Sequence, residues 1–242
     1  MELPKELIEK LSKAKSIAVI TGAGISAESG VPTFRGADGL WKKYRAEELA
    51  TPYAFKKDPK LVWEWYDWRR GLISKTSPNK GHLAIAEMES LIKDFTLITQ
   101  NVDGLHRRAG SKNIIEIHGN LWRVKCIDHG HISYNMDVPL KEIPPHCHCG
   151  SIVRPDVVWF GESLSQSDIN NSYDALRRAE ILLVVGTSGI VQPVASFPHV
   201  AKEAGALVVE INIEKTPITA LADYTLLGPS GEVLPLIVDS IK

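Results

Sequence analysis

The chain has 242 residues, of which 44% are hydrophobic and 24% charged, a composition typical of a globular protein with one large domain or a domain with an insert. Its net charge of -1 argues against a large nucleic-acid-binding surface, and no apolar run approaches the roughly 20 residues that span a bilayer. The N-terminus lacks signal-peptide features, and the three cysteines do not suggest a secreted disulfide framework. We therefore expect a cytoplasmic protein with no direct nucleic-acid or membrane partner.

The first predicted elements are a helix and a buried strand. Apolar residues recur at helical spacing from Leu3 to Leu11 and predict an amphipathic helix over 4–14. The β-branched run 17–20 then predicts a buried strand.

A glycine-containing turn follows this strand. The pattern Gly22-x-Gly24-x-x-Ala27 fits the dinucleotide-binding fingerprint, with alanine as its third small residue. A helix that begins near Ser26 would present free backbone N–H groups to a pyrophosphate. The acidic residue expected roughly 20 positions later occurs only within a polar, helix-like stretch around Glu47. A turn without a ligand therefore remains an alternative.

The region that follows, to about residue 80, is irregular and helix-prone, and its centre is dense in aromatic residues. Tyr66 and Arg69 are three residues apart and would share one face of a helix. Their spacing alone favours a helix docked by its aromatic side chains, with Arg69 solvated or paired with a nearby acid.

Two later segments predict strands that end in polar residues. Segment 95–101 ends in Gln100 and Asn101, with Asp103 close behind, and segment 114–119 ends in His118 and a glycine. Ligands of open α/β sheets bind beyond the carboxyl ends of the strands, so these side chains are candidates for chemistry. For His118, a structural role and a catalytic role are equal alternatives at this point.

Residues 121–155 differ from the rest of the chain, because they are polar, contain several prolines and hold all three cysteines. We interpret them as an inserted small module. Beyond them, strand candidates at 157–160, 181–188, 207–212 and 223–227 alternate with helix candidates at 175–179, 194–204 and 234–241. This alternation predicts a doubly wound, mostly parallel sheet.

Several short motifs stand out when the chain is taken as a whole. They are Gly22-Ala-Gly-Ile-Ser-Ala-Glu-Ser-Gly-Val-Pro-Thr-Phe-Arg35, Thr99-Gln-Asn-Val-Asp-Gly-Leu-His106, Ile117-His-Gly119, Arg154-Pro-Asp-Val-Val-Trp-Phe-Gly-Glu162, Gly186-Thr-Ser188 and Glu210-Ile-Asn212. In this order they resemble the sirtuin family of NAD-dependent protein-lysine deacylases. The resemblance implies a Rossmann-like NAD-binding domain made of residues 1–35, 81–120 and 156–242. It also implies a small domain that combines a helical insert, 36–80, with a zinc-ribbon-like module, 121–155.

The resemblance assigns roles to individual residues. The implied NAD-binding residues are Gly22, Ala23, Gly24, Ser26, Phe34, Arg35, Gln100, Asn101, Asp103, Gly186, Thr187, Ser188, Asn212, Glu214 and Ser230. Asn101 and His118 are the implied catalytic residues, and the near-neutral pKa of histidine suits His118 as a general base on a ribose hydroxyl. Val157, Val158 and Phe160 would form an apolar tunnel around an acylated lysine of a protein or peptide, by family analogy a chromatin or metabolic protein.

The family reaction consumes NAD. The acyl-lysine carbonyl oxygen attacks C1′ of the nicotinamide ribose, and further steps release nicotinamide, O-acyl-ADP-ribose and free lysine. Tyr66 and Arg69 coincide with a pair that binds acidic acyl groups in one class of sirtuins, and Ala50 with a small residue that widens that pocket. The resemblance therefore favours an acyl-binding role for this pair, and implies a deacetylase that could also remove succinyl or malonyl groups.

The metal-binding motif departs from the family pattern of two C-x-x-C pairs. This chain has Cys126-x-x-His129 and His146-Cys147-His148-Cys149. Thiolates and imidazoles both bind zinc, so Cys126, His129, His146 and Cys149 could form a structural tetrahedral site, with Cys147 as a substitute for His146. A module that has lost the metal and is held by packing is the alternative.

Two other functions remain open beside deacylation. One is mono-ADP-ribosyl transfer from the same NAD site, and the other is a non-catalytic sensor of NAD or ADP-ribose. Asn101, Asp103 and His118 argue against the sensor, since simple binding needs no base beside the ribose. NAD-dependent deacylation is the expected function.

Overall fold

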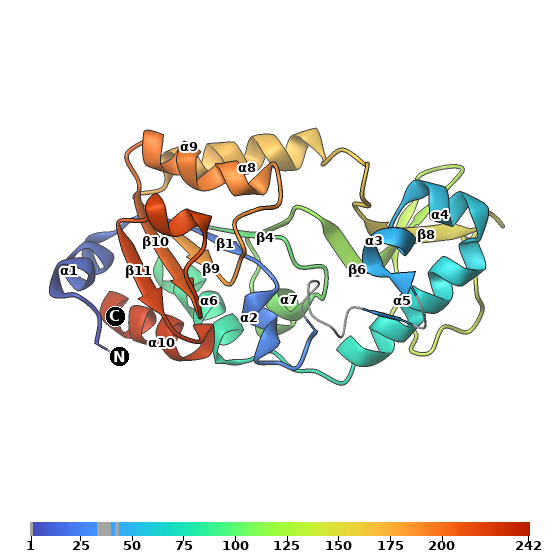
Figure 1. Cartoon of the computed structure of the whole chain (residues 1–242), viewed down its shortest axis with the longest axis horizontal. Coiled ribbons are helices and arrows are strands. Elements are labelled where there is room, and N and C mark those ends of the chain that lie inside the picture. The colour runs from blue at the N-terminus through green and yellow to red at the C-terminus, as the bar shows by residue number, and fades with distance from the viewer. Residues whose placement is uncertain (1, 33–39, 42–43) are drawn as a thin grey trace.

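The computed structural model describes residues 2–32, 40–41 and 44–242. Six parallel strands form its main sheet: β1 (Ser16–Thr21), β4 (Asp94–Thr99), β5 (Ile114–Glu116), β9 (Ile181–Val185), β10 (Leu207–Asn212) and β11 (Tyr224–Leu227). Their order across the sheet is β11-β10-β9-β1-β4-β5 (Figure 1). The chain starts in the middle, winds to one edge and then to the other, which confirms the predicted doubly wound fold.

Helices cover both faces of this sheet. On one face pack α1 (Lys5–Lys13), α6 (Lys80–Leu91) and α10 (Ser230–Ile241), and on the other α8 (Gln166–Arg178) and α9 (Phe197–Glu203). β1 is buried along its whole length. Ile17 and Val19 face the first core, whereas Ala18 and Ile20 face the second. The continuous apolar run in the sequence is thus explained by burial on both faces.

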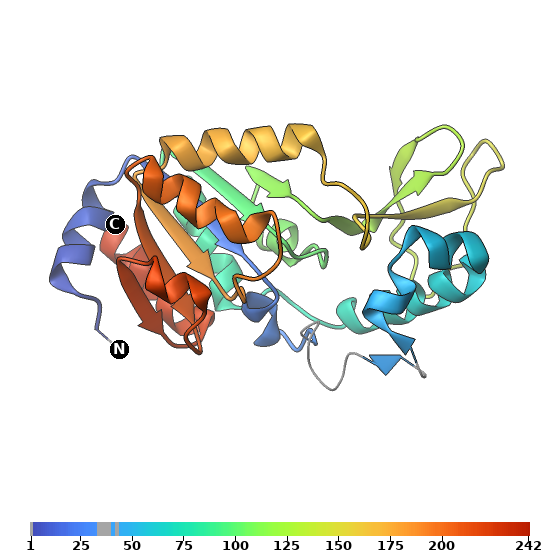
Figure 2. The same cartoon turned by 45° about the horizontal axis from the view of Figure 1, so that its top comes forward.

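A smaller part of the molecule lies beside the sheet (Figures 1 and 2). Its helices are α3 (Ala46–Leu49), α4 (Pro52–Lys57) and α5 (Pro59–Ile73), and its three-stranded sheet consists of β7 (Ile132–Tyr134), β6 (Gly119–Cys126) and β8 (Val153–Val157) in that order. A hairpin, β2 (Leu40–Trp41) and β3 (Tyr44–Arg45), precedes these helices. Both chain termini lie at the far end of the main sheet (Figures 1 and 2).

The small part has a hydrophobic core of its own. Trp63 and Trp65 from α5 pack with Trp122 of β6, Val153 of β8 and Trp159, and all five side chains are buried. α5 begins where Asp58 accepts a hydrogen bond from the Leu61 N–H, with Pro59 in the first turn, as expected for a capped helix. The helical segment and the cysteine-containing segment therefore fold together around one core.

Some predicted elements were wrong in extent. The strand expected at 157–160 is in fact β8, which ends at Val157, and residues 158–160 lie outside the regular strands. The helix expected to begin near Ser26 begins at Gly24, as α2 (Gly24–Ala27). α10 begins at Ser230 rather than 234, and β6 occupies a segment for which no strand was predicted. Among the residues described, no helix has the length and apolar character needed to cross a membrane.

The remaining helical turns connect these elements. They are α7 (Leu105–Ala109), the 3-10 turn η2 (Val194–Ser196) and the 3-10 turn η3 (Pro217–Ala220). α7 follows directly on the polar residues at the end of β4, so the helix anchors that loop close to the middle of the sheet.

Candidate active site

The glycine turn after β1 packs against the loop after β9, at the point where the strand order reverses. The Gly22 N–H donates to the Val185 oxygen at 3.0 Å, and the Gly24 N–H donates to the Gly186 oxygen at 2.8 Å. A Cβ on Gly24 would lie 2.7 Å from that oxygen. The small residues of the fingerprint are therefore required for the approach of two loops, in addition to any approach of a ligand.

We expect Gly24→Ala to lower the free energy of unfolding by about 1–3 kcal/mol, because backbone atoms of Gly186 would have to move. Urea unfolding should show a lower midpoint with an unchanged slope. Gly71→Ala is the matched control, since open space surrounds Gly71 in α5 and alanine favours a helix. Equal midpoints for the two variants would contradict the expectation.

Polar side chains from three strand ends meet beside these glycines. Asn101 Nδ2 donates to the Gly22 oxygen at 3.0 Å and to Ser26 Oγ at 3.1 Å. Gln100 Nε2 donates to Thr187 Oγ1 at 3.0 Å, and Asn212 Nδ2 donates to the Thr187 oxygen at 3.0 Å. Predicted site residues that are far apart in the sequence are thus brought into one hydrogen-bonded group at the carboxyl edge of the sheet.

Asp103 is a buried carboxyl group within this cluster, only 5% exposed. Burial raises the pKa of Asp103, while the Leu105 N–H and the Ser26 hydroxyl, each at 2.8 Å, oppose that rise by donating to the carboxylate. The positive charge of Arg69 also lowers the pKa of Asp103. Asp103 is therefore held in one orientation, with donors on both carboxylate oxygens.

His118 follows β5 and lies close to the end of β4. Its Nδ1 is 3.1 Å from the Gln100 carbonyl oxygen, and a carbonyl can only accept, so Nδ1 carries the proton. Nε2 is then the unprotonated nitrogen, and burial lowers the pKa of His118. An imidazole fixed in this tautomer and neutral at pH 7 is suited to act as a general base.

The segment 157–162 connects His118 with the small part of the molecule. The Val158 N–H donates to the His118 oxygen at 2.9 Å, and the Phe160 N–H donates to the Ala50 oxygen at 3.0 Å. Val157 and Val158 are half-buried, whereas Phe160 is 52% exposed. The three residues predicted to form an apolar tunnel thus lie on a segment that touches both His118 and the predicted acyl pocket.

Tyr66 and Arg69 lie on α5, three residues apart, and the Arg69 guanidinium lies 5.2 Å from the centre of the Trp65 ring. Tyr66 is buried, its ring packs edge-on against Trp65 at 4.6 Å, and its oxygen accepts a hydrogen bond from Trp159 Nε1 at 2.8 Å. The positive charge of Arg69 lowers the pKa of both Tyr66 and Asp103, so the guanidinium lies near both groups. Tyr66 therefore docks the helix, as its spacing suggested, and lies near the positive charge of Arg69.

The cysteine-containing segment forms a compact group of potential metal ligands. Ligand atoms of Cys126, His131, Cys147 and Cys149 all lie within 4.8 Å of one another. Cys126 Sγ and Cys149 Sγ are 3.6 Å apart, close to the about 3.8 Å that a tetrahedral site with zinc–sulfur bonds of about 2.3 Å implies. Hydrogen bonds with Ser151 lower the pKa of the Cys149 thiol to about 6, which favours the metal-binding thiolate. The group is compatible with a structural zinc.

This group corrects the predicted ligand set. His131 takes the place expected for His129, because the turn after β6 pairs Cys126 with His131: the Cys126 N–H donates to the His131 oxygen at 2.8 Å. His146 is not in the group either, and its Nδ1 lies 3.1 Å from Glu142 Oε1. Cys147, the substitute considered for His146, is a member.

The other predicted NAD-binding residues have varied surroundings. Ser230 is buried and donates to Glu28 Oε1 at 2.8 Å, whereas Ser188 and Glu214 are exposed. Ala23 is half-buried in the glycine turn. Phe34 and Arg35 lie outside the described residues.

Sequence reasoning missed a buried histidine layer behind the cluster. The Asn79 N–H donates to His82 Nδ1 at 3.3 Å, so His82 Nε2 carries the proton and faces Ser26 Oγ at 3.3 Å. His106 Nε2 is 3.0 Å from Thr21 Oγ1, and the rings of His82 and His106 are 4.7 Å apart. Burial lowers the pKa of His82 to about 4. The only sequence signal was the position of His82 three residues before the buried Ile85.

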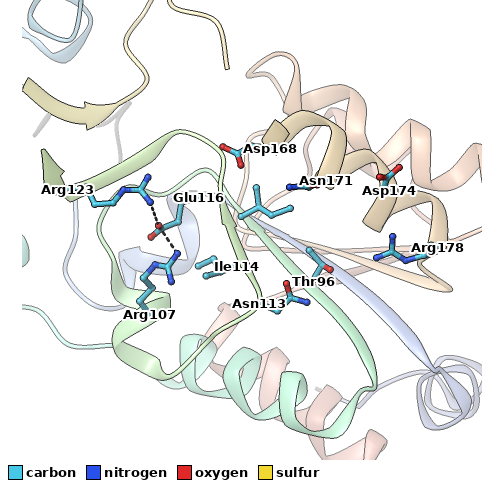
Figure 3. Close-up of a pocket in the computed structure, with 11 residues that line it drawn as sticks. Thr96, Arg107, Asn113, Ile114, Glu116, Arg123, Asp168, Asn171, Asp174 and Arg178 are labelled. Carbon is cyan, nitrogen blue, oxygen red and sulfur yellow. Dashed lines mark hydrogen bonds and ion pairs between the residues drawn. The ribbon is translucent and has the colours of Figure 1, made fainter. Parts of the chain in front are cut away.

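A cavity of about 480 Å³ lies elsewhere, at the β5 edge of the sheet, and contains none of the predicted site residues. Figure 3 shows Glu116 in this cavity between Arg107 and Arg123, whose nitrogens are 3.0 Å and 3.4 Å from Glu116 Oε2. Arg123 also pairs with Asp156 of β8 at 2.9 Å. These ion pairs join the main sheet to the small part. We interpret the cavity as a surface depression at this contact.

Comparison with known sequences agrees with the site. A sequence model of the Sir2 family matches residues 22–193. The NAD-dependent protein deacylase of Aquifex aeolicus is 59% identical over 228 residues, 94% of this chain and 95% of the relative. The NAD-dependent protein deacylase of Pyrococcus furiosus is 52% identical over 243 residues, 98% of this chain and 97% of the relative.

Solved structures give the same result. The crystal structure of a Sir2 homologue in complex with NAD has a TM-score of 0.93 and 46% sequence identity, covering 99% of this chain and 94% of that one. A Sir2 variant with a deacetylated p53 peptide and 3′-O-acetyl ADP ribose has a TM-score of 0.87 and 30% identity, covering 99% of this chain and 98% of that one.

Proposed function

The chain belongs to the Sir2 family, and from this premise we propose that it is an NAD-dependent protein-lysine deacylase. The reaction gives nicotinamide, O-acyl-ADP-ribose and free lysine. The observation that carries the proposal is His118 at a strand end, whose imidazole is held by the carbonyl of Gln100, the residue before Asn101 of the Asn101–Ser26–Asp103 cluster. A site that only bound a nucleotide would need no oriented base there.

NAD fits the carboxyl edge of the main sheet. The glycine turn, the strand-end amides and the loop after β9 would hold it, through Gly22, Ala23, Gly24, Ser26, Gln100, Asn101, Asp103, Gly186, Thr187, Ser188, Asn212, Glu214 and Ser230. Phe34 and Arg35 belong to the same proposed set. Bound NAD supplies a ribose carbon that carries a good leaving group, nicotinamide, for attack by the acyl oxygen.

The chain itself supplies orientation and proton transfer. Asp103, with both carboxylate oxygens hydrogen-bonded, would fix the carboxamide end of NAD, and Asn101 would face the ribose. His118 Nε2 would accept the proton of a ribose hydroxyl, because Nδ1 is already bound to the Gln100 carbonyl. Val157, Val158 and Phe160 would line the lysine stem and exclude water from the reacting atoms. The substrate peptide would add as a strand near Gly161 and Gly189.

The acyl pocket would accept acidic as well as neutral groups. Tyr66 and Arg69 offer a phenol and a guanidinium, which together suit a carboxylate. Ala50, a small residue whose carbonyl oxygen accepts a hydrogen bond from the Phe160 N–H, would leave room beside them. Acetyl, succinyl and malonyl groups are the proposed substrates, carried on chromatin or metabolic proteins by family analogy.

We further propose that zinc is bound by Cys126, His131, Cys147 and Cys149 in a purely structural site. A thiolate-rich site of this kind suits a reducing compartment, which supports the cytoplasmic location. The separate core of the small part supports the proposed division into an NAD-binding domain of 1–35, 81–120 and 156–242 and a small domain of 36–80 and 121–155.

The function is tested by incubating the protein with NAD and matched acetyl-lysine and succinyl-lysine peptides. We expect nicotinamide and O-acyl-ADP-ribose to form only when an acylated peptide is present, as followed by mass spectrometry. ADP-ribosylated protein without O-acyl-ADP-ribose would instead support the transferase. NAD binding without nicotinamide release from either peptide would support the sensor.

A further inference from the structure

One buried hydrogen bond joins the segment 157–162 to the predicted acyl pocket. Trp159 Nε1 lies 2.8 Å from the Tyr66 oxygen, and the two side chains are 3% and 2% exposed. The bond links α5 with the segment 157–162, across 93 positions of the chain.

The chemistry of the indole fixes the direction of this bond. An indole N–H can only donate, so the phenol oxygen must accept. No oxygen of the described residues accepts the phenol proton in turn, and that proton remains available to a ligand. Burial raises the pKa of Tyr66 to about 12, so the phenol stays protonated near neutral pH.

The indole is itself held on several sides. The Arg154 guanidinium lies 3.6 Å from the centre of the Trp159 ring, and Arg154 makes two hydrogen bonds to Glu162, at 2.5 Å and 2.8 Å. Glu162 Oε2 also accepts the Trp159 backbone N–H at 2.9 Å, and the Phe55 ring packs on the indole at 5.2 Å. The direction of the indole N–H is therefore set by its surroundings and is independent of any ligand.

We propose that Trp159 is a positioning residue for acyl specificity: it occupies the acceptor side of the Tyr66 phenol and so directs the phenol proton toward the carboxylate of an acidic acyl chain. With the Arg69 guanidinium, the pocket then offers hydrogen-bond donors to the end of the acyl chain. A carboxylate uses both donors, whereas an acetyl group has no atom that reaches them. The inference rests on the acidic-acyl role proposed above for Tyr66 and Arg69.

The test is Trp159→Phe, which keeps an aromatic ring against Arg154 and removes the N–H. Without it the phenol can turn, and the ratio of kcat/KM for succinyl-lysine to that for acetyl-lysine peptide should fall about tenfold. The fall should appear as a higher KM for the succinyl peptide rather than a lower kcat, because the lost contact is made in the bound substrate.

Trp63→Phe is the matched control. Trp63 is buried in the same core and its ring also packs against Tyr66, with ring centres 6.2 Å apart, but its Nε1 donates to the Val153 carbonyl oxygen at 2.8 Å and not to the phenol. The Trp63→Phe variant should be destabilised about as much as Trp159→Phe, but its ratio of kcat/KM for succinyl-lysine to acetyl-lysine peptide should be unchanged. If Trp159→Phe does not fold, β-(3-benzothienyl)alanine at position 159 keeps the bicyclic shape and replaces the N–H by sulfur.

A double-mutant cycle with Tyr66→Phe decides how Trp159 acts. In the Tyr66→Phe background, removal of the indole N–H should leave the ratio unchanged, because no phenol remains to be oriented. An equal fall in both backgrounds, or no fall in either, would overturn the inference while the acidic-acyl function stands. If the unmodified protein removes acetyl but neither succinyl nor malonyl groups, the acidic-acyl proposal is wrong and this inference is overturned with it.

Discussion

Replacement of His118 by alanine is expected to lower kcat/KM for deacylation by about 10²–10⁴-fold, the usual contribution of a positioned general base. The imidazole makes one backbone hydrogen bond, to the Gln100 oxygen, so the fold should survive its removal. NAD binding, measured by calorimetry, should be retained. His199→Ala, at an exposed histidine of α9, is the control and should keep full activity.

The pH profile offers an independent check on the same residue. Burial lowers the pKa of His118 below the ordinary value of 6.5, and the base works only when it is neutral. Activity should therefore be full at pH 7, and the acidic limb of kcat/KM should fall below pH 6.5. An acidic limb above that pH, or an active His118→Ala protein, would mean that another group is the base.

Loss of the metal site is the second large effect we expect. The protein should contain one zinc per chain by elemental analysis, and Cys126→Ala should remove it and lower the free energy of unfolding by about 4–5 kcal/mol or more. Cys126 is the buried member of the group and ends β6, so its loss reaches the core shared with α5. Chelation of the unmodified protein should have the same effect, seen as a lower thermal midpoint.

Two neighbouring histidines provide a matched pair for this prediction. His131→Ala should release zinc, whereas His129→Ala should retain it, because only His131 lies within the ligand group. Both side chains are exposed, so other losses of stability should be equal for the two variants. The reverse result would restore the ligand set expected from C-x-x-C spacing.

The contrast between these histidines shows where the sequence was informative. The alternation of strands and helices was sufficient to predict the doubly wound sheet, because each strand end is marked by a change from apolar to polar residues. The identity of the potential metal ligands depends on the register between β6 and β7, which the sequence does not reveal. A two-residue difference in the turn after Cys126 decides between His129 and His131.

Tertiary contacts also explain why the strand predicted at 157–160 does not continue beyond Val157. Val157 to Phe160 form an apolar run typical of a buried strand, yet after Val157 the backbone bonds to the His118 and Ala50 carbonyls instead of to a neighbouring strand. His82 was missed for a related reason, since its role depends on Ser26, 56 residues away. Local pattern predicts elements well and predicts contacts between distant segments poorly.

The backbone hydrogen bonds that hold segment 157–162 have a consequence for how such an enzyme can evolve. Its bonds to His118 and Ala50 run through backbone atoms, so they do not depend on which side chains the segment carries. Tyr66 and Arg69, the proposed acyl-binding residues, belong to a separate helix, α5. If these residues act as proposed, a lineage can exchange side chains at these positions and acquire a new acyl preference, while the backbone bonds keep His118 in place.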